Sequence, residues 1–299
     1  MKILISGATG LLGKHLTPTL EAKGHEIFSL VRKTPKNDHE IQWDAMEGFA
    51  EGEQAKLEGM DAVIHLAGEP IAQTWTKEKK RLIKESRTIG TRTLVGAMGK
   101  TKNPPKHFIS ASAIGYYGQE RGDEILTEES PHGDGYLPEI CVEWENEARK
   151  AADLGARVVF LRTGIVLSKD GGALAQMMTP FGFGVGGVVG SGKQYMSWIE
   201  LEDLLAVINF ILENENVRGP VNATAPNPVT NQTFTKTLGE VLNRPTFIPV
   251  PEFAVKFMFG EMGEVLLLGG ARVLPKKLED LGFTFRYPEL KEALKKAIE

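Results

Sequence analysis

The sequence predicts an α/β fold with a doubly wound parallel β-sheet, followed by a smaller α/β domain toward the C-terminus. From the N-terminus to about residue 163, short apolar runs alternate with stretches of helical periodicity. The connections between these segments are short, which is typical of β-α-β units with parallel strands. Beyond residue 164 the pattern changes to a glycine-rich stretch and then to short segments punctuated by proline.

Each segment follows from its local pattern. Short apolar runs bounded by glycine or polar residues predict buried strands at Lys2–Ser6, Glu26–Arg32, Ile41–Trp43, Asp61–Leu66, His107–Ser110 and Arg157–Arg162. Helical spacing of apolar residues predicts helices at Leu11–Lys23, Thr76–Met98, Leu137–Ala152 and Leu201–Leu212. Thr179–Lys193 is too rich in glycine for a regular helix.

The chain is therefore expected to divide into two parts. Residues 1–163 form the sheet domain, and residues 164–299 form the smaller domain, whose last part, from about 245 to 299, is a distinct segment. The boundary is soft, because a strand or a helix from residues 195–225 can return to the main sheet.

Composition excludes several classes of partner and site. The 35 Lys and Arg residues against 39 Asp and Glu give a net charge of −4, without the basic clusters that nucleic acid or an anionic membrane requires. Cys141 is the single cysteine, so no intrachain disulfide forms, and the six histidines show no metal-ligand spacing. No apolar run is long enough for a signal peptide core or a membrane span. We expect a cytoplasmic protein without a metal.

A glycine-rich loop lies between the first strand and the first helix. It reads Gly7, Ala8, Thr9, Gly10, Leu11, Leu12 and Gly13. Glycines at this spacing allow a tight turn and close approach of a pyrophosphate to the backbone, and the helix N-terminus offers free N–H groups. A chance glycine-rich turn is the alternative, but the strand–loop–helix context favours a dinucleotide site on a Rossmann fold.

The end of the second strand indicates which dinucleotide binds. An acidic residue there would bind the ribose 2′-hydroxyl of NAD, whereas arginine accommodates the 2′-phosphate of NADP. The chain has Arg32 and Lys33 at this point, which predicts NADP(H), although an exposed basic turn would look the same. Asp44 is a candidate for an adenine contact or for a cap.

A further turn of small residues follows the fourth predicted strand. It comprises His65, Leu66, Ala67, Gly68 and Glu69. Small residues there let the cofactor ribose lie against the backbone, and His65 is either part of this contact or only a polar strand end.

These motifs together resemble the extended short-chain dehydrogenase/reductase superfamily, and most closely an atypical, epimerase-like branch with its own C-terminal domain. The matching motifs are residues 7–13, His65–Glu69, Ser86-Arg87-x-x-Gly90-Thr91, Ser110-Ala111-Ser112, Cys141-x-x-Trp144-Glu145, Gly186–Gln194, Ser197-Trp198-Ile199, Arg272–Pro275 and Gly282–Pro288. The resemblance implies an NADP-binding domain followed by a substrate-side domain. It also implies that Arg87 reaches the NADP side and that Ser110 and Ala111 line the nicotinamide ribose.

Chemistry in this superfamily uses a Ser, a Tyr and a Lys four residues after the Tyr. Ser112 and Tyr136 match the first two, but Ile140 stands at the lysine position. A phenol without a nearby cation is a poor base at neutral pH, so standard hydride chemistry is in doubt. Tyr136 either keeps a catalytic role or only packs at the start of its helix.

Other groups could replace the missing function, and they are Glu69, Tyr116, Tyr117, Glu143, Trp198 and, on the glycine-rich loop, Lys193. Residues 187–193 nearly match a nucleotide triphosphate loop, but Gln194 stands at the Mg²⁺-binding position, so a loop over the substrate cleft is favoured.

The sequence therefore predicts an NADP(H)-dependent oxidoreductase or epimerase-like enzyme acting on an unidentified small molecule. The alternative is a non-catalytic NADP(H)-binding regulator that responds to the redox state of the cofactor.

Overall fold

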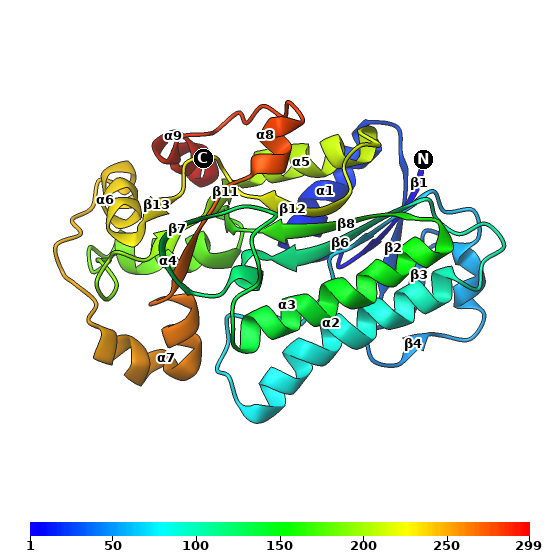
Figure 1. The fold of residues 1–299 in the computed structure, drawn as a ribbon, viewed down its shortest axis with the longest axis horizontal. Coiled ribbons are helices and arrows are strands. Elements are labelled where there is room, and N and C mark those ends of the chain that lie inside the picture. Colours follow the sequence, from blue (N-terminus) through cyan, green and yellow to red (C-terminus); the bar gives the residue numbers. More distant parts are fainter.

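The computed structural model describes residues 1–299 and is built around one eight-stranded sheet, in the order β12-β8-β6-β5-β1-β2-β3-β4 (Figure 1). Its strands are β1 (Lys2–Ser6), β2 (Glu26–Val31), β3 (Glu40–Asp44), β4 (Gly48–Phe49), β5 (Ala62–His65), β6 (His107–Ala113), β8 (Arg157–Thr163) and β12 (Gly219–Ala223). Neighbouring strands are parallel except β3 and β4. This confirms the predicted α/β fold.

Helices cover both faces of the sheet (Figure 1). One face packs against α1 (Leu11–Ala22) and α5 (Leu201–Glu213), and the other against α2 (Lys77–Met98) and α3 (Tyr136–Arg149). Alternation along a strand makes this possible, because successive side chains point to opposite faces. In β1, Ile3 and Ile5 belong to the first core and Leu4 to the second.

Residues from the second half of the chain complete the main sheet. β12 pairs in parallel with β8, with Val221 opposite Leu161, and α5 covers the same region. Residues 195–225 thus contribute a helix and a strand to the sheet that the first 163 residues begin.

The remaining elements form a lobe at one end of the sheet (Figure 1). Apart from α8 (Lys276–Asp280), which packs through Leu278 into the sheet core that α5 covers, they are β9 (Ile165–Leu167), α4 (Gly172–Gly182), β10 (Tyr195–Met196), β11 (Trp198–Glu200), β13 (Val229–Thr230), α6 (Asn231–Leu242), α7 (Glu252–Leu266), β14 (Gly270–Val273) and α9 (Leu290–Ile298). β7 (Glu120–Leu126) pairs with β14 and so ties the lobe to the sheet domain. The core of the lobe includes Trp198 and Phe234.

The expectation of no regular helix from Thr179 onward is wrong for its first residues, because α4 continues to Gly182. The buried side chain of Phe181 packs into the core of the lobe, and this tertiary contact outweighs the local cost of proline and glycine. No helix combines the length and the apolar character that crossing a membrane requires.

Candidate functional site

The first and third glycines of the loop between β1 and α1 are required by packing. Gly7 has φ +73°, and a Cβ there would lie 3.0 Å from the amide nitrogen of Ala67. A Cβ at Gly13 would lie 2.5 Å from the Cα of Ala8 and would also clash with the carbonyl oxygen of Gly7. These two glycines therefore bring β1, α1 and the turn after β5 together.

The middle glycine faces a more open space. Gly10 has φ −74° and ψ 174°, a conformation that any residue adopts, and a Cβ there would meet only the carbonyl oxygen of Gly7, at 3.3 Å. No side chain caps the start of α1. The first N–H groups of this helix are therefore available to an anionic ligand.

Two cations stand at the carboxyl end of β2. The side chains of Arg32 and Lys33 are exposed and make no hydrogen bond or ion pair within the chain. The pKa of Glu69 is lowered, mainly because Gln73 donates a hydrogen bond to it, with further contributions from Lys79 and from the charge of Arg32. β2 and β5 flank β1 in the parallel sheet, so Arg32 and the turn after β5 lie at the same carboxyl edge.

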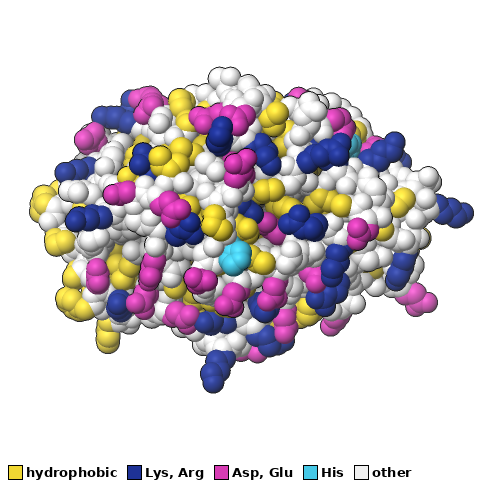
Figure 2. Space-filling model, in the orientation of Figure 1, with side chains coloured by type: hydrophobic (Ala, Val, Ile, Leu, Met, Phe, Trp, Pro, Cys, Tyr) yellow, Lys and Arg dark blue, Asp and Glu magenta, His cyan; other side chains and the backbone are white.

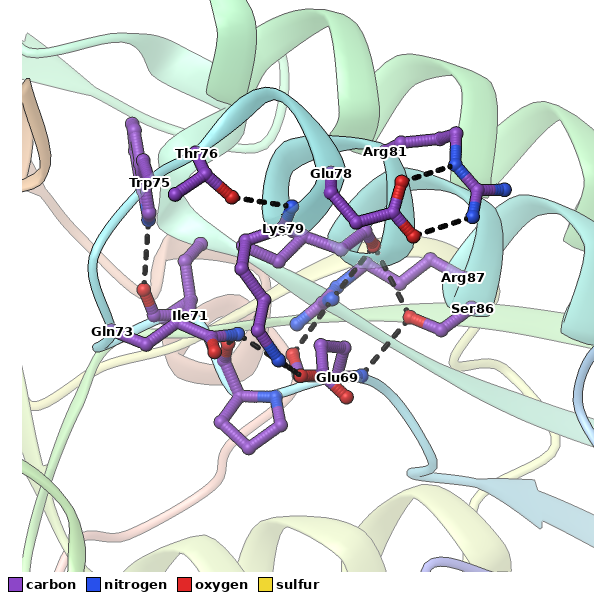
Figure 3. Close-up of polar contacts among 12 residues, drawn as sticks. Glu69, Ile71, Gln73, Trp75, Thr76, Glu78, Lys79, Arg81, Ser86 and Arg87 are labelled. Carbon is purple, nitrogen blue, oxygen red and sulfur yellow. Dashed lines mark hydrogen bonds and ion pairs between the residues drawn. The ribbon is translucent and has the colours of Figure 1, made fainter.

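Polar contacts hold the turn after β5 in place (Figure 3). The Oε1 of Glu69 accepts hydrogen bonds from Gln73 at 3.1 Å and from Lys79 at 3.2 Å. Its backbone N–H donates to Ser86, and Arg87 donates to its carbonyl oxygen at 3.0 Å. The turn is thus fixed from α2.

The side chain of Arg87 contacts this turn from α2. Its guanidinium donates also to the carbonyl oxygen of Ile83, and it would lie 3.2 Å from a Cβ at Gly68. It makes no ion pair with a carboxylate, and burial lowers its pKa. These contacts place Arg87 between α2 and the turn after β5, and its role toward NADP stays a prediction.

The side chains of His65 and Asp44 form hydrogen bonds within the protein. His65 is fully buried, and its Nδ1 lies 2.6 Å from the hydroxyl of Ser6, which also accepts hydrogen bonds from the backbone of Leu66 and Ala67. Burial, with a smaller contribution from Arg87, lowers the pKa of His65 to about 4, so the ring is neutral. Asp44 accepts hydrogen bonds from the backbone N–H groups of Met46 and Glu47, so it caps the turn between β3 and β4. An adenine contact stays a prediction.

The serines of β6 are also engaged. Ser110 donates to the carbonyl oxygen of Ala111 at 3.1 Å, and Ser112 donates to Glu145 of α3 at 2.8 Å. Glu145 forms a buried ion pair with Arg162 of β8, with two N–O distances of 2.8 and 2.9 Å. Ser112 thus takes part in a contact that fastens α3 to the sheet.

The same network continues toward the lobe. Arg162 donates to the hydroxyl of Tyr117 at 3.0 Å, and that hydroxyl donates to Asn222 of β12 at 2.7 Å. The guanidinium also lies 3.4 Å from the ring centre of Tyr116. Burial raises the pKa of Tyr117 to about 12, so Tyr117 is a neutral hydrogen-bonding group here. The Glu145–Arg162 pair could not be predicted from the sequence, because its partners lie on separate elements.

Comparison with known proteins decides the family. The model of the NAD dependent epimerase/dehydratase family matches residues 3–223, and a domain of unknown function, DUF1731, matches residues 250–297. The chain belongs to this epimerase/dehydratase family. The resemblance found in the sequence motifs is thereby confirmed.

Relatives of this epimerase family share the whole length of the chain. The human epimerase family protein SDR39U1 is 36% identical over 302 residues, which cover 100% of both chains. The epimerase family protein YfhF of Bacillus subtilis is 39% identical over 303 residues, covering 100% of this chain and 98% of YfhF. An epimerase family protein of Mycobacterium tuberculosis is 41% identical over 293 residues, covering 98% and 96%.

Solved structures agree with this assignment. A crystal structure of human SDR39U1 with NADPH superimposes with a TM-score of 0.89 at 34% identity and covers 100% of both chains. The UDP-glucose 4-epimerase of Thermus thermophilus, in complex with NAD, has a TM-score of 0.78 at 17% identity over 100% and 98% of the chains, a likeness of fold alone.

Tyr136, at the tyrosine position of the epimerase family, bonds to α2 and not to Ser112. The Tyr136 hydroxyl donates to the backbone carbonyl of Lys80 on α2 at 2.7 Å, while the Lys80 ammonium lies 4.3 Å from the ring centre. Burial raises the pKa of Tyr136 to about 12. Ser112 and Tyr136 thus bond to separate partners, and Tyr136 packs at the start of its helix.

The lysine position of the family lies in an apolar cluster. Ile140 is buried with Trp75 and Ile83, and partly buried residues of α7, which are Met262, Val265 and Leu266, pack against them. Lys80 forms an ion pair with Glu261 of α7 at 2.7 Å. The face of α3 that carries Tyr136 and Ile140 is therefore covered by the C-terminal domain.

The other replacement candidates do not gather at one point. Glu143 pairs with Lys84 on the surface at 2.7 Å, and Trp198 is fully buried in the lobe. Lys193 is exposed, and its ammonium makes no contact with another side chain. A groove of about 780 Å³ lies between α1, α5 and α9, away from the glycine loop, and is lined largely by charged residues that pair with one another.

Proposed function

We propose that the protein binds NADP(H) at the carboxyl edge of its sheet, between the glycine loop, the end of β2 and the turn after β5. The residues present fit such a ligand. Gly10 carries no side chain where the start of α1 is uncapped, and Ala67 and Gly68 provide a small, fixed surface opposite. The single observation that carries the proposal is this three-sided arrangement of loop, cations and turn.

The choice of NADP(H) over NAD(H) rests on charge. Arg32 and Lys33 have no partner in the chain, so an added phosphate gains contacts without breaking others. The crystal structure of human SDR39U1 contains NADPH, and that protein is 34% identical over the full length. Both points support the phosphorylated dinucleotide.

We propose that the reaction is a reduction or an epimerisation of an unidentified small molecule. A bound nicotinamide would supply or accept the hydride. The glycine loop would hold the pyrophosphate, and the turn after β5 would orient the ribose. Tyr136 would not move the proton, because its hydroxyl is committed to Lys80 and its pKa is raised to about 12.

A second candidate is a non-catalytic regulator that binds NADP(H). It is favoured by a specific observation: Ile140 stands at the lysine position and lies buried under α7. A protein that only senses the cofactor needs no acid–base pair, but it does need contact between the cofactor site and another domain. The turn after β5 supplies such contact, since Trp75 packs near α7.

Titration of the wild type and Arg32→Ala with NADPH and NADH tests the cofactor. Loss of one charge-assisted contact should cost about 1.5–3 kcal/mol, or roughly 10–150-fold in NADPH affinity. NADH affinity should not change. An Arg32→Ala variant that keeps the preference of the wild type for NADPH would contradict the assignment.

A panel of carbonyl compounds with NADPH then separates enzyme from regulator. Oxidation of NADPH above background with any member supports the enzyme. Tight NADPH binding with no turnover, together with a change in protease sensitivity of α7 on binding, supports the regulator.

We also propose a cytoplasmic location, on the absence of clustered cysteines and of a long apolar run. A plant relative is described as chloroplastic, so fractionation of cells that express the tagged protein is the direct test.

A further inference from the structure

The C-terminal domain carries a strongly apolar exposed surface, here called the aromatic surface. Its members are Phe183, Val185, Phe247, Ile248, Phe253, Phe257, Met258 and Phe259. Figure 2 shows hydrophobic side chains along the left margin of the molecule, where α7 and the segment before it lie in Figure 1. None of these residues belongs to the cofactor site.

Two segments far apart in sequence are held together beneath this surface. Gly187 and Phe247 form an antiparallel bridge, and the backbones of Val188 and Gly190 exchange hydrogen bonds with Val250. A Cβ at Gly187 would run into the backbone of Ile248. Gly187 therefore serves this close pairing, which brings Phe183 and Val185 near the segment that leads into α7.

α7 has two halves with different surroundings. Its backbone breaks at Gly260, with φ 57° and ψ −143°. The half after Gly260 packs through Met262 and Val265 against the cluster around Ile140. The half before it presents Phe253 and Phe257, one helical turn apart, to the outside. The second half thus anchors the helix and the first half forms the surface.

The exposed area is large for a monomer. Phe183, Phe247, Phe253 and Phe257 are 82, 81, 75 and 91% exposed. At roughly 200 Å² for each side chain, these four alone expose about 650 Å² of apolar surface. The largest apolar patch on a typical monomer is about 300–600 Å², and a stable dimer buries about 800 Å² on each partner. The four less exposed members, which are Val185, Ile248, Met258 and Phe259, bring the aromatic surface to the area of a dimer interface.

The charges and shape of the surface discriminate between occupants. A substrate pocket encloses its ligand, so side chains that are 75–91% exposed do not line one. An anionic bilayer needs unpaired cations, and α7 offers none, because its single base Lys256 is paired with Glu264 and its Glu252 has no cationic partner. Lys256 forms an ion pair with Glu264 of the same helix at 3.0 Å. When two copies of the surface meet, these two charges are therefore already paired and do not repel each other across the contact.

We propose that the aromatic surface joins two copies of this chain in a two-fold symmetric dimer. An isologous contact places the same residues on both sides, and an apolar surface is complementary to itself. Phe253 and Phe257 are strongly exposed, lie one helical turn apart on α7 and are the expected hot spots. The anchor half of α7 then connects this interface to the cluster over α3, so the dimer holds the C-terminal domain against the sheet domain.

Sedimentation velocity over a range of protein concentrations tests the proposal. The wild type should sediment as a dimer, and Phe253→Ser with Phe257→Ser should raise the dimer dissociation constant by about 100-fold or more. A second pair, Phe183→Ser with Phe247→Ser, should act in the same direction. Ile125→Ser removes a half-exposed apolar side chain outside the surface and is the matched control.

All variants should keep the melting temperature of an isolated protomer and the NADPH affinity of the wild type, because the exposed phenylalanines support neither. A wild type that stays monomeric at about 100 µM, or variants that still dimerise like the wild type, would overturn the proposal. Co-sedimentation of the monomer with phosphatidylcholine vesicles, lost in the same variants, would assign the surface to a membrane instead. These results do not depend on the cofactor assignment.

Discussion

We expect Gly10→Val to weaken NADPH binding strongly and leave the fold intact. The backbone of Gly10 has φ −74°, which valine adopts, and an added Cβ would meet only the carbonyl oxygen of Gly7, at 3.3 Å. The rest of the valine side chain would occupy the space where the pyrophosphate approaches α1. Loss of one or two charge-assisted hydrogen bonds, at about 1.5–3 kcal/mol each, weakens binding by roughly 10-fold to 10⁴-fold.

Gly13→Ala should behave differently, and the contrast tests the reasoning. Its Cβ would lie 2.5 Å from the Cα of Ala8, so α1 must move away from β1. Overpacking of this kind costs about 1–3 kcal/mol of stability, and NADPH affinity should fall as well. The control is Gly96→Ala on the exposed side of α2, where a Cβ meets nothing within 4 Å and should add about 0.5–1 kcal/mol of stability.

Urea denaturation and calorimetric titration of the three variants are the assays. A folded Gly10→Val protein that binds NADPH like the wild type would refute the placement of the pyrophosphate. A Gly13→Ala protein as stable as the wild type would refute the packing argument for this glycine.

Three further substitutions probe the interior of the site. Tyr136→Phe should lower any NADPH-dependent turnover less than tenfold, whereas loss of a general acid or base lowers it about 10²–10⁴-fold. It should lower the free energy of unfolding by about 1 kcal/mol, because the Lys80 carbonyl loses a donor. A thousandfold loss in a rate assay would show that Tyr136 is a catalytic group. Arg162→Met should destabilise the fold by about 3–5 kcal/mol because it leaves Glu145 buried without a partner, and adding Glu145→Leu should recover most of this in urea denaturation; no recovery would contradict the explanation. His65→Asn should reduce the loss of stability on acidification from pH 6.5 to 4, measured by denaturation at each pH, and equal slopes for variant and wild type would contradict a buried neutral His65.

The sign of the pH effect follows from the two states. Burial lowers the pKa of His65 from its usual 6.5 to about 4, so the unfolded chain binds a proton that the folded chain excludes. The contribution of His65 to the free energy of unfolding is complete above pH 6.5. It falls by about 3 kcal/mol as the pH is lowered to 4. Glu200 acts in the opposite direction, because burial raises its pKa to about 7 and the folded protein gains stability as the pH falls below that value. Glu200 is present in both proteins, so its effect cancels when the pH dependence of stability is compared between His65→Asn and the wild type.

Most of the sheet could be predicted from the sequence. The runs at Lys2–Ser6 and Arg157–Arg162 are confirmed as β1 and β8 within one residue, because buried parallel strands are continuously apolar and end at glycine or polar residues. The pairing of β7 with β14 could not be predicted. These strands are about 150 residues apart in the chain, and β7 reads as a polar, exposed segment.

The cofactor site could be predicted further than the catalytic one. The roles proposed for the glycine loop and Arg32 depend on their own backbone or charge, so the local sequence is sufficient to predict them. The environment of Tyr136 depends on Lys80 and Glu261, which come from two other elements. The aromatic surface was also missed, since the first half of α7 is apolar without the periodicity of a buried helical face.

Calorimetric titration of the wild-type protein with NADPH and with NADH, in one buffer of fixed salt concentration, tests the central claim most directly. We expect one NADPH to bind per chain, and NADH to bind at least about tenfold more weakly, because the charges of Arg32 and Lys33 then lack their phosphate. NADH binding as tight as that of NADPH, or no binding of either dinucleotide by folded protein, would contradict the account.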